Sequence, residues 1–180
     1  MGVQTVMLVA AGFAKKELFP LKEDEPKLLG TIIIIQLVAI LGAIGMSRLS
    51  KRIGNWWVLT ISVLIWIAIC IAGYKVQTQT QFYILAAVVG LVMGGIQSMS
   101  RSTYSKLLPD TKDTTSFFSF YDVTEKIAIV IGIFTFAYLE EITGSMRNSI
   151  VALGLFFIAA IFALLYAKKP FDDRLKEVTN

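Results

Sequence analysis

Hydrophobic residues occur in six long runs along the chain, separated by short polar connections. A helix rises ~1.5 Å per residue, so ~20 apolar residues match the ~30 Å hydrocarbon core of a bilayer. Five of the runs reach this length, over about 28–46, 56–74, 82–102, 117–139 and 149–167. The pattern predicts an all-α membrane protein with six transmembrane helices in one bundle over 1–168, followed by a cytoplasmic tail over 169–180. The six expected helices cover about 1–14, 28–46, 56–74, 82–108, 117–139 and 147–168.

The first run is too short to cross the membrane. Val3–Ala14 reaches only about two-thirds of the way through the hydrocarbon core. Met1 is then expected inside the membrane, where a charged amino terminus is energetically expensive. We therefore expect a polytopic membrane protein, or part of one, cut within its first helix.

Composition agrees with a membrane protein and excludes several other classes. The chain is 56% hydrophobic and 17% charged, and its mean hydropathy is +0.69. The net charge of +4 comes from basic residues in short connections, which does not indicate a nucleic-acid partner. Histidine is absent, and Cys70 is the single cysteine. With no metal-ligand spacing and no nucleophile–base pair, we predict no enzyme activity, no metal and no cofactor.

The basic residues near the ends of the runs suggest an orientation, because cytoplasmic loops of membrane proteins carry an excess of Lys and Arg. One side carries nine of them: Arg48, Lys51, Arg52, Lys106, Lys112, Lys168, Lys169, Arg174 and Lys176. The other side carries six: Lys15, Lys16, Lys22, Lys27, Lys75 and Arg147. This bias favours a cytoplasmic carboxy terminus in the cell membrane.

The run from Gln81 to Leu108 carries two stripes at helical spacing. Small residues recur every four positions, at Ala86, Gly90, Gly94, Ser98 and Ser102. Small residues let helix backbones approach closely in lipid, so Gly90, Gly94 and Ser98 are expected in helix packing, with a direct ligand role as the alternative. The second stripe is polar and contains Gln97, Arg101 and Tyr104. Arg101 lies ~10 Å below the cytoplasmic surface, a depth from which its side chain can also snorkel.

The following run carries three ionisable residues on one helical face, Asp122, Glu125 and Lys126. Ionisable groups inside a membrane pair with one another or line a wet cavity, so we expect them to meet Arg101, which lies at similar depth. Arg101 is expected to pair with Asp122 or Glu125, and Glu125 is favoured because Lys126 is placed to compensate Asp122. The cluster is interpreted as a gate or coupling site, with a purely structural polar cluster as the alternative.

Two further polar residues lie inside apolar runs, Gln4 and Gln36. For each, hydrogen bonding between helices and a role in a cavity are equally open. The candidates for a substrate path or gate are then Gln4, Gln36, Gln97, Arg101, Tyr104, Asp122, Glu125 and Lys126.

The short basic segment 47–54, with sequence SRLSKRIG, resembles the signature loop of the major facilitator superfamily. Leu49, Arg52 and Gly54 match that loop. Ser47 replaces its first glycine and Lys51 its acidic residue, departures that are typical of the loop in the second half of such transporters.

A more specific resemblance rests on four segments: GVQTV at 2–6, GGIQSMSRS at 94–102, LLP at 107–109, and FFSFY at 117–121 with Lys126. Together they resemble the branch of the superfamily related to the vacuolar amino-acid effluxer of autophagy. The resemblance covers essentially the whole chain as a carboxy-terminal half. It implies helices seven to twelve of a twelve-helix transporter, with both termini cytoplasmic and no covalent cofactor.

The resemblance implies one half of a secondary transporter that moves a small solute by alternating access across the lipid bilayer. Amino acids are the implied solute of the fungal branch, whereas the solute of bacterial members and coupling to protons are open. Such a half needs either a missing amino-terminal half or a second copy to complete the path. The alternative is a half-size membrane module that does not transport or that dimerises.

Overall fold

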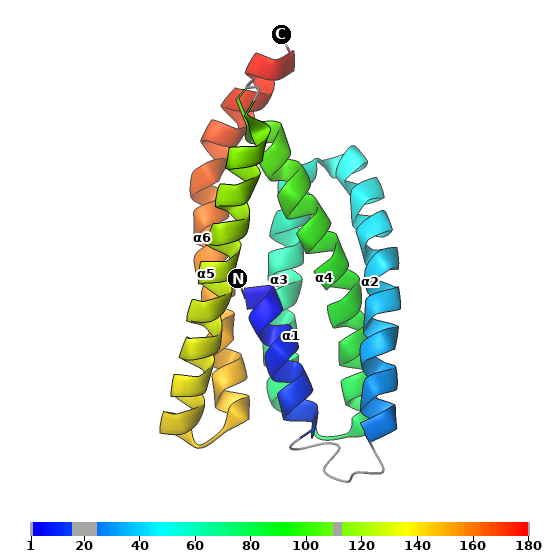
Figure 1. Cartoon of the computed structure of the whole chain (residues 1–180). Helices are drawn as coiled ribbons and strands as arrows, with labels where there is room; N and C mark the ends of the chain where they lie inside the picture. Colours follow the sequence, from blue (N-terminus) through cyan, green and yellow to red (C-terminus); the bar gives the residue numbers. More distant parts are fainter. Residues whose placement is uncertain (1, 16–24, 110–112, 180) are drawn as a thin grey trace.

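The computed structural model describes residues 2–15, 25–109 and 113–179. Within these ranges the chain forms an all-α bundle (Figure 1). Its helices are α1 (Gly2–Phe13), α2 (Glu25–Ile53), α3 (Asn55–Lys75), α4 (Gln79–Leu107), α5 (Thr114–Thr143) and α6 (Met146–Thr179). Helix α6 thus continues through the segment 169–179, where the sequence suggested a separate tail.

Successive helices run in opposite directions, so the connections alternate between the two ends of the bundle (Figure 1). One end carries the α2–α3 and α4–α5 connections together with the carboxy terminus, and we call it the C-terminal end. The opposite end carries the α1–α2, α3–α4 and α5–α6 connections. Helix α1 begins near the middle of the bundle and runs to this opposite end, as expected for a short first run.

Four described helices are long and apolar enough to cross a membrane. They are the segments Leu29–Ile53, Asn55–Lys75, Gln79–Leu107 and Met146–Lys168. Five full spans were expected, and α5 is the one that differs. At 30 residues α5 is long enough, but Asp122, Glu125 and Lys126, with two glutamates near its end, leave no sufficiently apolar stretch.

Polar side chains mark the beginnings of two helices. Thr78 accepts a hydrogen bond from the Gln81 backbone N–H (3.3 Å), and Gln81 accepts one in return, which forms a capping box for α4. Asp113 accepts hydrogen bonds from the Ser116 hydroxyl (2.7 Å) and backbone N–H (3.2 Å) at the start of α5. These hydrogen bonds hold the pKa of Asp113 below its usual value, because they favour the charged carboxylate.

Helices α2 and α4 form the most extensive contact of the bundle. A Cβ atom added at Gly94 would overlap the backbone carbonyl of Ala39, and one added at Gly42 would overlap that of Leu91. At Gly90 the added atom would lie 2.7 Å from a carbonyl oxygen of α2. The two backbones therefore touch along glycines, which is how helices gain van der Waals contact in lipid.

The helices form two spatial groups. Helix α3 packs with α2 and α4, whereas α1 packs against α5 and α6. The most extensive contact between the groups is that of α3 with α6, where Trp66 stacks on Phe157 with ring centroids 5.4 Å apart. Helix α1 crosses α5 closely, since a Cβ atom at Gly132 would overlap the Thr5 side chain.

Candidate functional site

Arg101 of α4 and Asp122 of α5 form an ion pair at the C-terminal end of the bundle. The Arg101 Nη2 atom donates to the Asp122 Oδ1 atom over 2.6 Å. The two residues were expected at one depth on antiparallel neighbours, and the structure has them so. Both acids were expected as possible partners. The preference for Glu125 is wrong, because it is Asp122 that receives the guanidinium.

Further side chains connect the same two helices. The hydroxyls of Ser100 and Tyr121 share a hydrogen bond of 2.9 Å, and the Tyr104 hydroxyl donates to the backbone oxygen of Phe117 over 2.9 Å. The Tyr104 and Tyr121 rings lie 5.0 Å apart, and the Arg101 guanidinium carbon lies 5.7 Å from the Tyr121 ring centroid. A polar and aromatic cluster thus joins α4 to α5. We call this set of residues, together with Asp122, the bridge.

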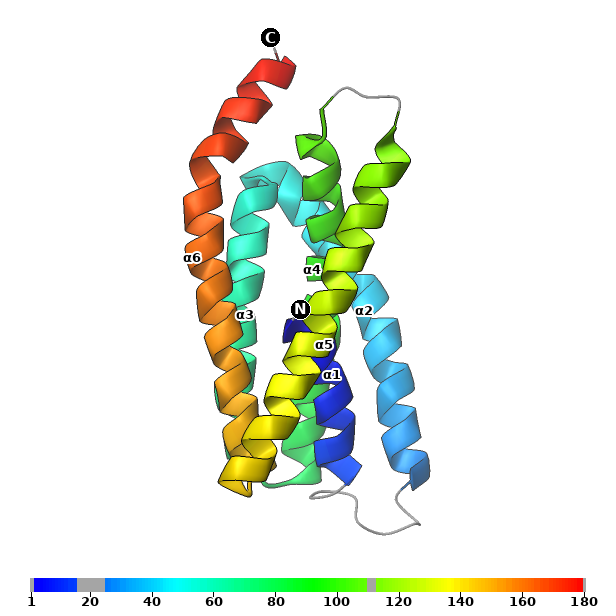
Figure 2. The ribbon, with the colours of Figure 1, turned by 60° about the vertical axis from the view of Figure 1, so that its left-hand side comes forward.

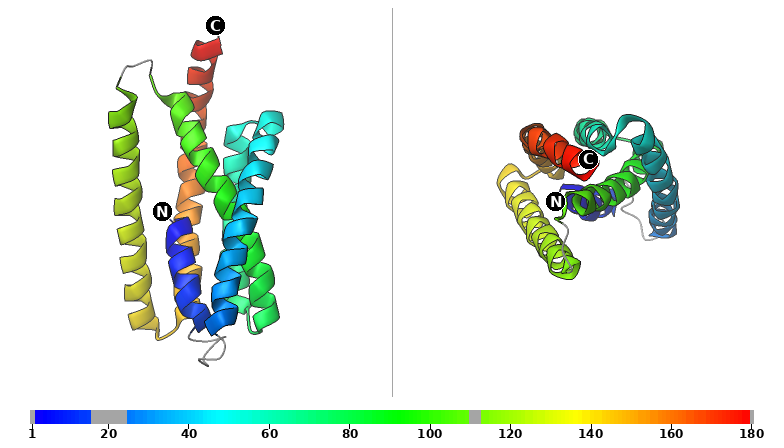
Figure 3. Two further views of the ribbon diagram at one scale, coloured as in Figure 1. Left: turned by 45° about the vertical axis from the view of Figure 1, so that its right-hand side comes forward. Right: turned by 90° about the horizontal axis from the view of Figure 1, so that it is seen from above.

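The bridge is the place where α4 and α5 come together. Away from the C-terminal end the two helices diverge, and the start of α1 lies between them (Figures 1 and 3). In the view of Figure 2, α5 passes in front of α1. The side chains of Arg101 and Asp122 are 55% and 51% exposed. The described helices therefore enclose neither charge completely.

The other sequence candidates occupy different positions. Gln97 is exposed on α4, one turn from Arg101 toward the middle of the bundle, and Lys126 is exposed on α5. Glu125 is half-buried. Gln36 is exposed on α2, next to the buried position Ile35 and away from the bridge. Gln4 lies in α1, but its side chain is outside the part of the chain that the structure describes.

The small-residue candidates of α4 face two different surroundings. Gly90 and Gly94 lie against α2, as described above. The Ser98 hydroxyl donates to the Gly95 carbonyl within its own helix (3.0 Å) and is half-buried. The structure therefore brings Arg101, Tyr104 and Asp122 together, and it leaves Gln36 apart from them.

Sequence reasoning missed two members of the bridge, Ser100 and Tyr121. A signal existed for both, because Ser100 precedes Tyr104 by four residues and Tyr121 precedes Glu125 by four, which places each pair on one helical face. A second polar contact was missed nearby: the amide of Asn55 on α3 donates to Thr103 and accepts from Lys106, both over 3.3 Å. This contact ties the start of α3 to the end of α4.

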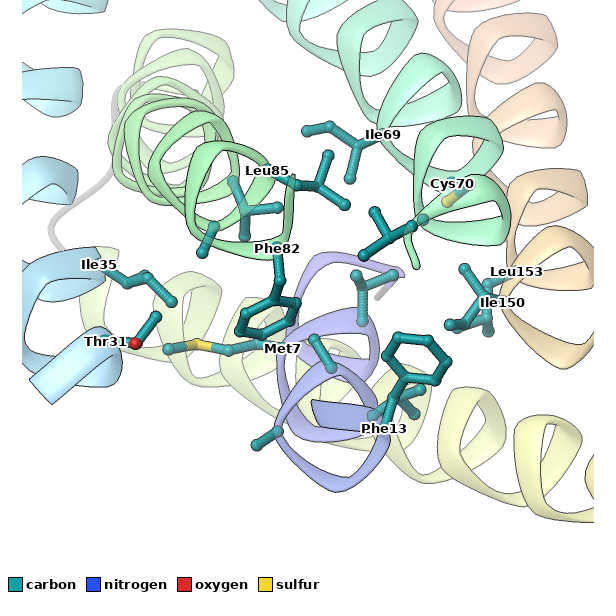
Figure 4. Close-up of a pocket in the computed structure, with 18 of the residues that line it drawn as sticks. Met7, Phe13, Thr31, Ile35, Ile69, Cys70, Phe82, Leu85, Ile150 and Leu153 are labelled. Atoms are coloured by element: carbon teal, nitrogen blue, oxygen red, sulfur yellow. The ribbon is translucent and has the colours of Figure 1, made fainter. Parts of the chain in front are cut away.

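A cavity of about 300 Å³ lies toward the opposite end of the bundle, between α1, α2, α3, α4 and α6 (Figure 4). Its wall is almost entirely apolar, and Met7 of α1 extends toward Thr31 of α2. The Thr31 hydroxyl already donates to the Lys27 carbonyl over 2.8 Å. Cys70 supplies a thiol to the same wall. The cavity therefore offers apolar surface, and the charged candidates lie elsewhere.

Comparison with known proteins identifies related sequences along nearly the whole chain. The family model described as "Vacuole effluxer Atg22 like" matches residues 1–170. The "Uncharacterized MFS-type transporter YxiO" of Bacillus subtilis (strain 168) is 28% identical over 179 residues, covering 99% of this chain and 41% of the relative. "Autophagy-related protein 22" of Kluyveromyces lactis is 30% identical over 169 residues, covering 87% of this chain and 33% of the relative.

The chain thus spans less than half the length of these curated relatives. No solved structure gives a significant match. The matches agree with the all-helical bundle and its long apolar helices, and the family consists of transporters and not enzymes. This multi-pass membrane chain belongs to the Atg22-like family of major facilitator superfamily transporters.

Proposed function

We propose that the chain is the carboxy-terminal half of a secondary transporter that moves a small solute by alternating access. In such proteins the solute site lies between two halves, and one half rocks against the other. Here the solute path would follow the side where α4 and α5 diverge and α1 begins. The bridge would close this path at the C-terminal end.

The observation that carries the proposal is the bridge itself. A gate must be held by contacts that form and break within the free energy available from binding a solute. The Arg101–Asp122 pair meets this need because it is half-exposed and joins helices that otherwise diverge. A deeply buried pair would cost several kcal/mol to separate.

The nature of the solute follows from the resemblance rather than from the site. Amino acids are our proposed solute class, since the matching family model is described as an effluxer of the vacuole and the resemblance implies amino-acid efflux. Coupling to protons belongs to the same proposal, with the membrane carboxyl groups of α5 as the residues able to take part.

The function is tested with proteoliposomes and a panel of labelled amino acids. One preparation holds this chain alone, and the other holds it together with any in-frame six-helix segment encoded upstream of Met1. We expect uptake or efflux only in the second preparation, because one half supplies one wall of the path. Transport by the chain alone would indicate that two copies complete the path, and no transport in either preparation would contradict the proposal.

We also propose that the C-terminal end faces the cytoplasm. The structure gathers Arg48, Lys51, Arg52, Lys106 and Lys168 on helix segments at that end, and an excess of basic residues marks cytoplasmic loops. Lys168 is further held there, with its Nζ atom 5.0 Å from the Trp56 ring centroid.

A reporter fused after Asn180 tests this orientation. We expect activity from a reporter that works only in the cytoplasm, such as green fluorescent protein, and none from alkaline phosphatase, which needs the periplasm. The same pair of reporters fused within the α3–α4 connection at Gln77 should give the reverse result. Phosphatase activity after Asn180 would invert the whole topology.

A further inference from the structure

The contacts of the bridge fix the register between α4 and α5. Tyr104 lies beside Phe117, Ser100 beside Tyr121, and Arg101 beside Asp122. The helices are antiparallel. A step of one turn toward the middle of the membrane therefore leads to lower residue numbers in α4 and to higher residue numbers in α5. That turn places Gln97 at the level of Glu125.

Both residues also point toward the facing helix. Viewed down α4 at ~100° per residue, Gln97 projects between Arg101 and Tyr104, which both contact α5. Viewed down α5, Glu125 projects between Tyr121 and Asp122, which both contact α4. The Glu125 face continues into two positions buried in the bundle, Gly132 and Phe136. Gln97 is exposed and Glu125 is half-buried.

The charged groups around Glu125 leave its carboxyl available to a ligand. Asp122 is neutralised by Arg101 at 2.6 Å. Lys126 follows Glu125 directly, so it points ~100° away around α5, and it is exposed. Helix α1, whose start lies between α4 and α5, contains no charged residue from Gly2 to Phe13. On α6, the described charged side chains, Arg147 and Lys168, lie toward its two ends.

We propose that Gln97 and Glu125 bind the ammonium group of a solute directly beneath the bridge. This inference rests on the proposed transport function and specifies which chemical group of the solute the half recognises. An ammonium group has three N–H donors, and the Glu125 carboxylate and the Gln97 amide oxygen both accept. Because Asp122 is ion-paired with Arg101, Asp122 does not compete with Glu125 for the ligand.

The test uses the protein in its membrane and a hydrophobic carbodiimide, a reagent that adds to carboxyl groups within apolar surroundings. Peptide mass spectrometry measures the labelling rate at each acid. We expect Glu125 to be labelled several-fold faster than Asp122, and methylammonium to slow the labelling of Glu125. Glu141 lies exposed at the opposite end of α5 and is the internal control. Its labelling should not respond to methylammonium.

Two variants sharpen the result. Gln97→Leu should weaken the protection of Glu125 by methylammonium, since it removes an acceptor without removing the labelled carboxyl. Arg101→Ala should raise the labelling of Asp122, because the guanidinium that covers it is gone. The proposal is overturned if Glu125 is not labelled, if methylammonium leaves its labelling unchanged, or if Glu141 is slowed equally. Protected Glu125 in a protein that moves no solute would overturn the transport function alone.

Discussion

Replacing Gly94 with alanine is expected to cause a large loss of stability, comparable to that of Gly42→Ala at another glycine of the same helix contact. The new Cβ atom would overlap the backbone carbonyl of Ala39, and a backbone atom cannot move aside as a side chain end can. Helices α2 and α4 would have to separate along their whole contact. Overpacking costs ~1–3 kcal/mol and occasionally more. We expect the upper end of that range, which corresponds to a fall of about 10 °C in melting temperature for a chain of this size.

The matched control lies one helix away. Gly45 in α2 is also helical, and a Cβ atom there would meet nothing within 4 Å. Gly45→Ala should leave the melting temperature unchanged or raise it, because alanine stabilises a helix interior by ~1 kcal/mol relative to glycine. Circular dichroism of the detergent-solubilised protein measures both. If Gly94→Ala melts at the same temperature as Gly45→Ala, then the glycine contact is not what holds α2 and α4 together.

Replacing Arg101 with alanine is expected to impair transport without unfolding the protein. Within a water-filled solute path, as proposed above, a half-exposed ion pair contributes no more than ~1 kcal/mol, so its loss should lower the free energy of unfolding by at most that amount. In the proposed gate the ion pair forms only in the closed state, so its loss destabilises the closed state relative to the open one. A change of ~1 kcal/mol shifts such a two-state equilibrium about fivefold. Transport by the complete protein, assayed in proteoliposomes, should therefore fall by up to about fivefold, whereas the melting temperature should change little.

The identity of the partner gives this prediction its control. Removing Arg101 leaves the Asp122 carboxylate without its cation, and Arg101→Ala combined with Asp122→Asn should recover part of the lost transport. Arg101→Ala combined with Glu125→Gln should show no such recovery, because Glu125 does not receive the guanidinium. Rescue by Glu125→Gln, or normal transport by Arg101→Ala alone, would mean that the gate lies elsewhere.

The two acids of α5 show what local sequence patterns can predict and what they cannot. Asp122 and Glu125 are three residues apart, so both lie on the face that could meet Arg101. Choosing between them requires the rotation and the axial position of α5 relative to α4. The segment that joins the helices contains Pro109 and polar residues, and its sequence sets neither quantity. The rotation and axial position are set by three contacts between the helices, those of Ser100, Arg101 and Tyr104.

The packing of α4 also separates what the sequence predicts from what only the structure shows. A four-residue spacing of small side chains predicted a close helix contact, but several neighbours could have supplied the other surface. The structure assigns Gly90 and Gly94 to α2, and Ser98 bonds within its own helix. The apolar cavity near Thr31 had no sequence signal, because its wall is built from five helices that are each ordinary in composition.

The sequence by itself determined the number and order of the helices in the described residues, and the family to which the chain belongs. Hydropathy and helical period are properties of neighbouring residues, and each helix satisfies its own backbone hydrogen bonds. Only the tertiary structure decided that α2 packs on α4, that Asp122 holds Arg101, and that Gln97 and Glu125 share one level. These facts depend on how whole helices rotate and slide against each other, and many weak contacts from distant residues fix that arrangement together.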